Sequence, residues 1–137
     1  MLGTIDHVDV MSLTASSRSV PGTLRQEVVV DGRHVLFTDE PEAVGGGGSA
    51  PAPHELLPAA LAACISTTLV MYARTKEWDL DTVRVDVDYD HRSTPKRFEI
   101  DIAVTGDLTE AQCTMLDKVA GACPVRRAIE SGIHFEE

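Results

Sequence analysis

The segment from Pro53 to about Trp78 constrains the fold most, because it predicts one long helix between stretches of β pattern. Proline suits the first turn of a helix, and Glu55 there complements the positive end of the helix dipole. Pro58 removes one backbone hydrogen bond, so we expect it to bend the first turn or to restart the helix. Apolar residues recur at helical spacing and predict one inward stripe. That stripe consists of Leu57, Leu61, Cys64, Thr68 and Met71.

Two segments after this helix alternate strictly between apolar and polar residues, Val83 to Tyr89 and Phe98 to Val104. Such alternation is typical of half-buried strands, and a polar turn around Pro95 separates the two segments. They therefore predict an antiparallel pair.

Ahead of the helix, β-rich runs cover Thr4 to Thr14, Thr23 to Val30 and His34 to Thr38. Asp31-Gly32 between the last two predicts a two-residue hairpin turn, because both residues tolerate positive φ. The glycine run from Gly45 to Gly48 predicts a flexible loop that ends in a stiff proline-rich segment. The part of the chain before it is too short to fold alone, so we expect residues 1–137 to form a single domain.

The last third of the chain predicts two short helices. Thr109 is a good N-cap for a helix over Glu110 to Ala120, and Gly121 ends it. Cys123 occupies an N-cap-like position before Pro124, at the start of a helix that runs to Glu130. Ile133 to Glu137 can then form a final edge strand.

The acidic charge argues against several classes of partner. The chain has 22 acidic and 12 basic residues, for a formal charge of −10, which repels phosphate backbones and anionic membranes. The N-terminal residues 1–10 lack the apolar run of a signal peptide, and the apolar stretch 56–63 is too short to span a bilayer. We therefore expect a cytoplasmic protein that binds neither nucleic acid nor membranes.

The chemistry of the chain points to its cysteines, which number three. An odd number without an export signal favours reduced or redox-active thiols over a disulfide framework. Cys123 lies at a helix start near Arg126 and Arg127, which favours the thiolate, but it equally fits a small residue that begins a helix. Cys64, on the inner stripe of its helix, is by its local sequence more typical of inert packing, and Cys113 is interpreted as core packing.

Metal and cofactor chemistry find no support in the sequence. The three cysteines and five histidines show no C-x-x-C or H-x-x-x-H spacing, so we expect no metal site. The glycine run lacks the Lys-Ser/Thr of a phosphate-binding loop, and no nucleophilic serine lies in a G-x-S-x-G turn. We therefore expect no bound cofactor.

Two motifs resemble those of the OsmC/Ohr family. The first is the run P-H-E-L-L-P-A-A-L-A-A-C from Pro53 to Cys64, and the second is Cys123-Pro124-Val125 at the start of a helix. The order of strands, glycine-rich loop, cysteine helix, alternating strands and Cys-Pro-Val helix also agrees. The resemblance implies an α+β fold with antiparallel sheets around a long central helix. It also implies an intertwined homodimer with the active site at the subunit interface.

The resemblance further implies a thiol-dependent peroxidase that reduces organic hydroperoxides to alcohols. In this reading Cys64 becomes a sulfenic acid, and Cys123 condenses with it to a disulfide that an external dithiol, such as dihydrolipoamide or a lipoylated protein, reduces. Glu55 matches the glutamate that orients an arginine beside the thiolate. Arg33 is the candidate for that arginine, with Arg25 and Arg18 as alternatives. The other reading is a non-catalytic redox sensor or a binding protein for apolar ligands.

Overall fold

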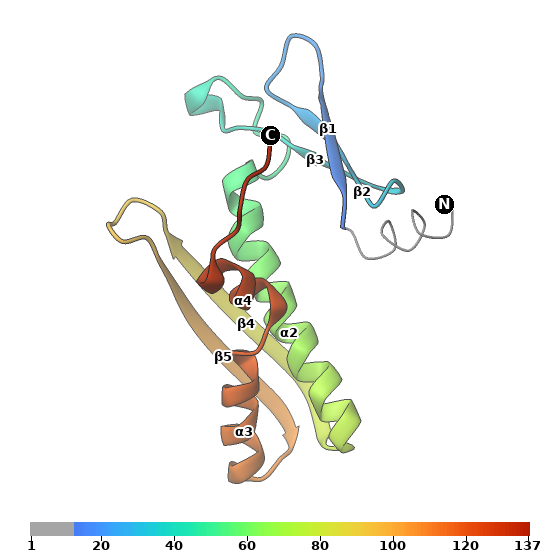
Figure 1. Cartoon of the computed structure of the whole chain (residues 1–137), viewed down its shortest axis with the longest axis vertical. Coiled ribbons are helices and arrows are strands. Elements are labelled where there is room, and N and C mark those ends of the chain that lie inside the picture. Colours follow the sequence, from blue (N-terminus) through green and yellow to red (C-terminus); the bar gives the residue numbers. More distant parts are fainter. Residues whose placement is uncertain (1–12) are drawn as a thin grey trace. The chain divides into compact units, whose positions relative to one another are not determined.

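In the computed structural model, which describes residues 13–137, the chain divides between Leu56 and Leu57 into two units (Figure 1). The first unit holds a three-stranded sheet, and the second holds a two-stranded sheet with three helices. Most of the strand expected at 4–14 lies outside the described residues, and the single domain stays a prediction. In chain order the elements are β1 (Ala15–Ser19), β2 (Gln26–Val30), β3 (His34–Thr38), η1 (Glu42–Val44), η2 (Pro53–Glu55), α2 (Leu56–Lys76), β4 (Asp79–Asp90), β5 (Arg97–Asp107), α3 (Glu110–Ala120) and α4 (Pro124–Ser131).

The sheet of the first unit is an antiparallel meander in the order β1-β2-β3. The predicted hairpin is present, but Val30 pairs with His34, so its loop has three residues rather than two. Asp31 and Gly32 both have positive φ, as this dipeptide predicts, and Arg33 is the additional residue. Strand β1 is not anticipated by the sequence, because its residues are all exposed and lack apolar alternation. Only the pairing of its backbone with that of β2 makes this segment a strand.

The glycine run is ordered by one carboxylate, Asp39, which is only 3% exposed. Asp39 accepts hydrogen bonds from the Ser49 hydroxyl at 2.6 Å and from the backbone N–H groups of Ser49, Glu40 and Gly47. These bonds, the Ser49 hydroxyl foremost, lower the pKa of Asp39 from 3.8 to about 2. A Cβ at Gly46 would collide with the backbone carbonyl of Glu40, so glycine is required there. The loop that the sequence predicts to be flexible is thus anchored by these hydrogen bonds to Asp39.

The second unit is built on the long β4–β5 hairpin. The two strands pair antiparallel, with Val83 opposite Val104 and Tyr89 opposite Phe98, so both predicted segments are confirmed and extended. The Tyr89 and Phe98 rings stack with their centroids 4.7 Å apart. One face of the hairpin carries its half-buried apolar side chains, which pack against the core of the unit.

Helix α2 supplies most of that core through a row of four residues at a spacing of four. The buried row is Leu61, Ile65, Leu69 and Ala73. The predicted stripe is therefore wrong in part, since its ends Leu57 and Met71 are 38% and 62% exposed. The buried residues of α2 are four positions apart, whereas the predicted stripe alternates steps of four and three. The two rows of residues therefore diverge along the helix.

Pro58 does not remove the intrahelical hydrogen bond that the sequence predicts it to remove. The segment begins as the 3₁₀ turn η2 and becomes an α-helix at Leu56, so Pro58 falls in the first α-helical turn. There its missing N–H leaves no intrahelical bond unmade.

By length and composition, the segment Pro53–Lys76 could also cross a membrane, with a mean hydropathy of 1.8 over its most apolar window. The sequence prediction that no segment spans a membrane rests on residues 56–63, which are too short to cross a bilayer. The buried row of α2 packs within the second unit, as the core helix of a globular protein does.

The two C-terminal helices match their predictions closely. Thr109 caps α3 through a reciprocal pair of hydrogen bonds with Gln112, and Cys123 is the N-cap residue of α4. The strand expected at 133–137 is absent from the described residues. Ile133 and Phe135 remain exposed, so no burial favours strand pairing there.

The carboxylate of Asp39 predicts a local response to acid. Its lowered pKa means that its hydrogen bonds stabilise the loop fully above pH 3.8, and that this stability is lost as the pH falls toward 2. We expect the amides of Gly47 and Ser49 to lose hydrogen-exchange protection between pH 4 and pH 2. Asp39→Asn should show weak protection at both pH values, whereas Glu42→Gln in the same loop should behave like the wild type. Equal acid sensitivity in Asp39→Asn would contradict this assignment.

Candidate functional site

Two cysteines from distant parts of the chain lie in the same core. Cys64 is on α2, one residue before the buried Ile65, and Cys123 is fully buried at the start of α4. The half-buried Cys64 packs against the cluster that contains Cys123, and both thiols are free. Cys113 is half-buried on α3 and is also free. The structure therefore brings together the two cysteines that the motifs single out.

Burial raises the pKa of the Cys123 thiol above its ordinary value. The second cause is the Cys64 side chain, toward which a protonated Cys123 can donate a hydrogen bond. The backbone N–H groups of Arg126 and Val125 act in the opposite direction without forming a cap hydrogen bond to Cys123. Desolvation is the larger effect, so Cys123 is a protonated thiol at neutral pH. Its local sequence, with a helix start and two arginines, suggests the reverse.

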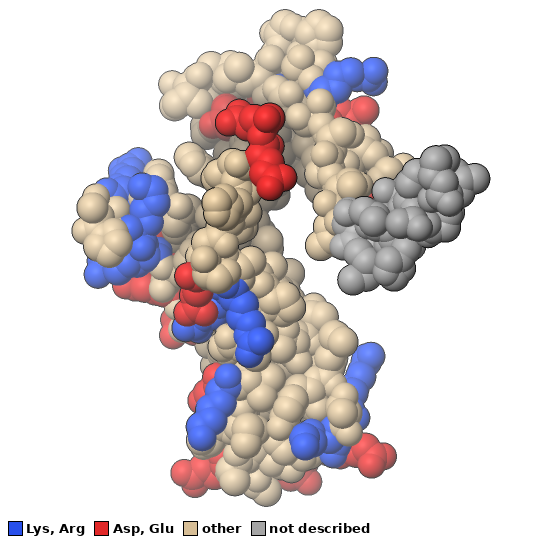
Figure 2. Space-filling view, viewed as in Figure 1, with Lys and Arg blue, Asp and Glu red and all other residues tan. Residues whose placement is uncertain are grey.

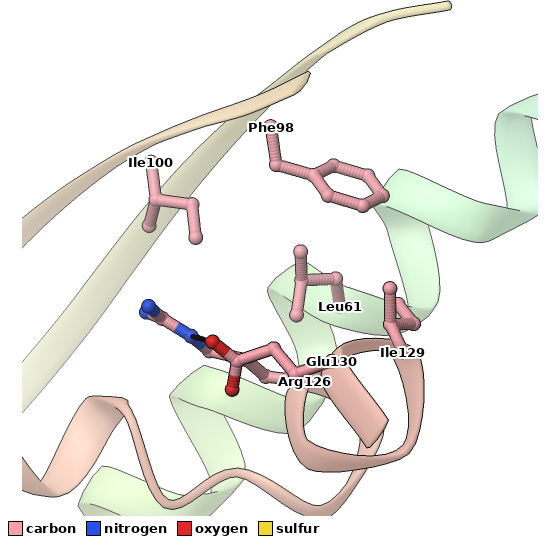
Figure 3. Close-up of a pocket in the computed structure, with 6 residues that line it drawn as sticks. All are labelled: Leu61, Phe98, Ile100, Arg126, Ile129 and Glu130. Atoms are coloured by element: carbon pink, nitrogen blue, oxygen red, sulfur yellow. Dashed lines mark ion pairs between the residues drawn. The ribbon is translucent and has the colours of Figure 1, made fainter. Parts of the chain in front are cut away.

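A pocket of about 200 Å³ lies between α2, β5 and α4, and neither Cys64 nor Cys123 is among its lining residues (Figure 3). Its walls are mainly apolar, and one side carries an ion pair between Arg126 Nε and Glu130 Oε2 at 3.5 Å. The apolar lining consists of Leu61, Phe98, Ile100 and Ile129.

Helix α2 carries a pocket residue as well as Cys64, and α4, which begins after Cys123, carries other pocket residues. Leu61 precedes Cys64 by about one helical turn on α2, and Arg126 lies in the first turn after Cys123. From the sequence, Arg126 is identified only as a charge near Cys123. Its position in the pocket lining depends on the packing of α4 against β5.

The other candidate residues belong to the first unit and have local partners there. Arg33 is exposed in the hairpin loop and forms an ion pair with Asp31 at 3.3 Å. The Glu55 carboxylate accepts a hydrogen bond from the backbone N–H of Ala52 at 2.8 Å, which caps the 3₁₀ turn η2. Their roles beside Cys64 stay predictions.

The two alternative arginines differ in how firmly they are held. Arg18 is largely exposed, 3.7 Å from the carboxylate of Glu27. Arg25 donates to the Ser49 hydroxyl at 2.6 Å and lies over the Phe37 ring, 4.1 Å from its centroid. Neither partner of Arg25 is adjacent in sequence, so local patterns could not reveal this anchoring.

Metal ligands do not gather in the part of the chain that the structure describes. Within residues 13–137, no three or more His, Cys, Asp or Glu side chains are placed to hold a metal ion. The candidate site in the second unit thus consists of two thiols, an apolar pocket and one ion pair.

This is a small α+β dithiol protein. Its two free thiols, on the long core helix and at the start of α4, lie in the same core. The chain belongs to the OsmC-like protein family, whose model matches residues 46–137. No curated protein matches the chain.

Several solved structures share this fold. An osmotic stress induced and detoxification response protein from Psychrobacter arcticus 273-4 is 26% identical, with a TM-score of 0.70 over 83% of this chain and 85% of that chain. The organic hydroperoxide resistance protein OsmC from Legionella pneumophila is 25% identical, with a TM-score of 0.60 over 86% and 88%. OhrB of Bacillus subtilis, at 20% identity, has a TM-score of 0.55 over 86% and 90%. The α+β fold with antiparallel sheets and a long helix is thus that of OsmC and Ohr proteins.

The raised pKa of Cys123 predicts slow alkylation at neutral pH. Following carbamidomethylation of each cysteine peptide by mass spectrometry against pH should give a Cys123 midpoint above that of an ordinary thiol. In Cys64→Ala the midpoint should fall, since one cause of the shift is removed, yet stay raised because burial remains. Cys113→Ala serves as the control and should leave the midpoint unchanged. A Cys123 midpoint below the ordinary value would show that the helix start prevails over burial.

Proposed function

We propose that this protein is a thiol-dependent peroxidase that reduces organic hydroperoxides to alcohols. The observation that carries the proposal is the placement of two free thiols, Cys64 and Cys123, in one core, within a unit that also holds a pocket with apolar walls. An apolar pocket suits the organic part of a hydroperoxide, and paired thiols suit a two-electron reduction. Membership in a family that includes organic hydroperoxide resistance proteins supports the same reading.

In the first step the Cys64 thiolate attacks the outer oxygen of the hydroperoxide. A sulfur–oxygen bond forms, the O–O bond breaks, and the alkoxide takes up a proton to leave as the alcohol. Cys64 is then a sulfenic acid, oxidised by two electrons. Cys64 is the half-buried thiol of the pair, and Cys123 is fully buried, which favours Cys64 as the group that meets the substrate.

In the second step Cys123 attacks the sulfenic sulfur. The disulfide forms, and the hydroxyl group leaves as water with the proton that Cys123 carried. The raised pKa of Cys123 keeps this thiol protonated during the first step, which leaves Cys64 as the nucleophile of that step. An external dithiol, of which dihydrolipoamide or a lipoylated protein is the proposed example, then reduces the disulfide by thiol exchange.

We further propose that an arginine steadies the thiolate, with Glu55 to orient it. Arg33 is the candidate by resemblance. Arg25 is the alternative. Its contacts with Ser49 and Phe37 favour it, because an arginine held in one geometry loses little conformational freedom when it binds a charge. A cytoplasmic location is proposed because reduced thiols persist there.

We also propose that the working form is a homodimer. Only 22% of the most apolar window of the long helix is buried within one chain, and Leu57 and Met71 are exposed on it. On the face shown in Figure 2, uncharged side chains cover much of the surface over α2. Such a surface is typical of one that a second copy covers.

A homodimer predicts twice the mass of one chain in sedimentation equilibrium at micromolar concentration. Met71→Glu should shift the equilibrium toward the monomer, because it places a charge on the apolar face of α2. Met115→Glu, on the exposed side of α3, is the matched control. A wild-type chain that sediments as a monomer would refute the dimer.

A second candidate function is the binding of an apolar ligand, or redox sensing, without turnover. The pocket itself favours this alternative, because its walls suit any small apolar molecule. The two functions differ in whether alcohol is released repeatedly in the presence of a dithiol.

Turnover of cumene hydroperoxide with a dithiol reductant tests the peroxidase. We expect Cys64→Ser to lower the rate by about three orders of magnitude, as loss of a nucleophile does. Without the dithiol, Cys123→Ser should consume one equivalent of hydroperoxide and leave a sulfenic acid on Cys64 that dimedone traps. Cys113→Ser is the control and should retain wild-type turnover. Full activity in Cys64→Ser would refute the mechanism, and a wild type that oxidises only once would favour the sensor.

A further inference from the structure

The turn between β4 and β5 carries positive charge on a chain that is otherwise strongly acidic. Residues 91–97 include Arg92, Lys96 and Arg97 and contain no Asp or Glu, whereas the whole chain has a formal charge of −10. All three residues are exposed. Figure 2 shows Lys and Arg side chains gathered at the free end of the hairpin, which projects beyond the helices of the second unit in Figure 1. We call Arg92, Lys96 and Arg97 the basic tip.

Hydrogen bonds fix the backbone of this turn. The Asp90 carboxylate accepts from the backbone N–H groups of Arg92 and Ser93, both at 3.2 Å. The Ser93 hydroxyl donates to the carbonyl oxygen of Pro95 at 2.9 Å. The hydrogen bonds to Asp90, the one from Arg92 foremost, lower the pKa of this carboxyl, so the group that organises the turn is ionised at neutral pH. An ordered turn loses little conformational freedom when it binds a partner.

The cations of the basic tip differ in whether they already have a carboxylate partner. Arg97 lies 3.8 Å from the Asp90 carboxylate, in a pair whose side chains are 63% and 41% exposed. Within residues 13–137, neither Arg92 nor Lys96 forms an ion pair. An external carboxylate can therefore pair with these two cations without breaking an ion pair of this chain.

The acidic neighbours of the basic tip limit the size of the anion that fits there. On the exposed face of the hairpin, Asp88 lies opposite Glu99 and Asp86 lies opposite Asp101. At about 3.3 Å per residue, these two pairs lie roughly 7 and 13 Å from the start of the turn. Charges are screened over about 8 Å at physiological ionic strength. A nucleic acid or an anionic membrane over the tip would meet all four carboxylates, whereas a segment of a few residues can avoid most of this negative charge.

We propose that the basic tip is a docking site for a short acidic segment, a run of Asp or Glu residues in a loop or tail of a partner protein. Arg92 and Arg97 can each donate two parallel hydrogen bonds to a carboxylate, and Lys96 adds a point charge. This interaction surface does not rest on the proposed peroxidase function, since none of its residues belongs to the pocket lining or to the core that holds the thiols. Because the cations are exposed, the binding is weak and is screened by salt.

The test measures the fluorescence anisotropy of a labelled peptide with four consecutive glutamates, titrated with the full chain at neutral pH and low salt. We expect saturable binding whose Kd rises about ten-fold when the salt concentration is raised to 0.2 M, because each ion pair is exposed to solvent. A peptide with four glutamines controls for the uncharged part of the peptide and should not bind. If the glutamate peptide shows no saturable binding at low salt, the proposal is overturned.

Matched variants separate the basic tip from the net charge of the chain. Arg92→Gln and Lys96→Gln should each raise the Kd for the glutamate peptide about three-fold, the effect of losing one exposed ion pair. Arg127→Gln on α4 and Lys118→Gln on α3 remove the same charge from exposed positions away from the tip and should leave the Kd unchanged. Equal effects of the tip variants and the control variants would show that only net charge matters, which would overturn the proposal.

NMR of the ¹⁵N-labelled chain locates the binding and distinguishes other partners. The glutamate peptide should shift the amide signals of residues 91–97 and leave those of α3 in place. Shifts of the same signals when the protein alone is concentrated would show that a second copy covers the tip. Tighter binding of a single-stranded 20-nucleotide DNA, or of vesicles rich in phosphatidylserine, would show that the tip serves a longer anion. Either of these last two results would overturn the assignment to an acidic protein segment.

Discussion

The packing of α2 against the β4–β5 hairpin is the constraint on which the second unit depends. The row from Leu61 to Ala73 fixes the rotation of the helix, and that rotation sets where Cys64 lies. The same core includes Leu116 and Ala120 of α3, whose end leads directly to Cys123. The contact between the thiols is thus a product of aliphatic packing. The burial that creates this contact also raises the pKa of Cys123, so structure and chemistry have one cause here.

Sequence patterns predicted the elements of the second unit well, because local rules determine them. Strict alternation found β4 and β5, and N-cap residues placed the starts of α3 and α4 to the residue. The inward face of α2 was predicted less well. An alanine-rich helix carries little contrast between its faces, so only its partner decides which row is buried.

The features that the sequence missed depend on contacts between distant residues. Nothing in a run of glycines signals that Asp39 will accept hydrogen bonds from the end of that run. The pairing of Cys64 with Cys123 came from the family resemblance, while local sequence favoured inert packing for Cys64. The pocket, with Arg126 and Glu130 on one wall, could not be predicted, because it forms only where α4 faces β5.

Helix α4 is only eight residues long, yet it is tied to both halves of the candidate site. Arg126 directs its backbone N–H toward the sulfur of Cys123 and its side chain into the wall of the pocket. A displacement of this helix therefore cannot alter the environment of the thiol without also changing the shape of the pocket. A substitution that moves α4 consequently changes the pKa of Cys123 and the shape of the pocket together, and cannot change one of them alone.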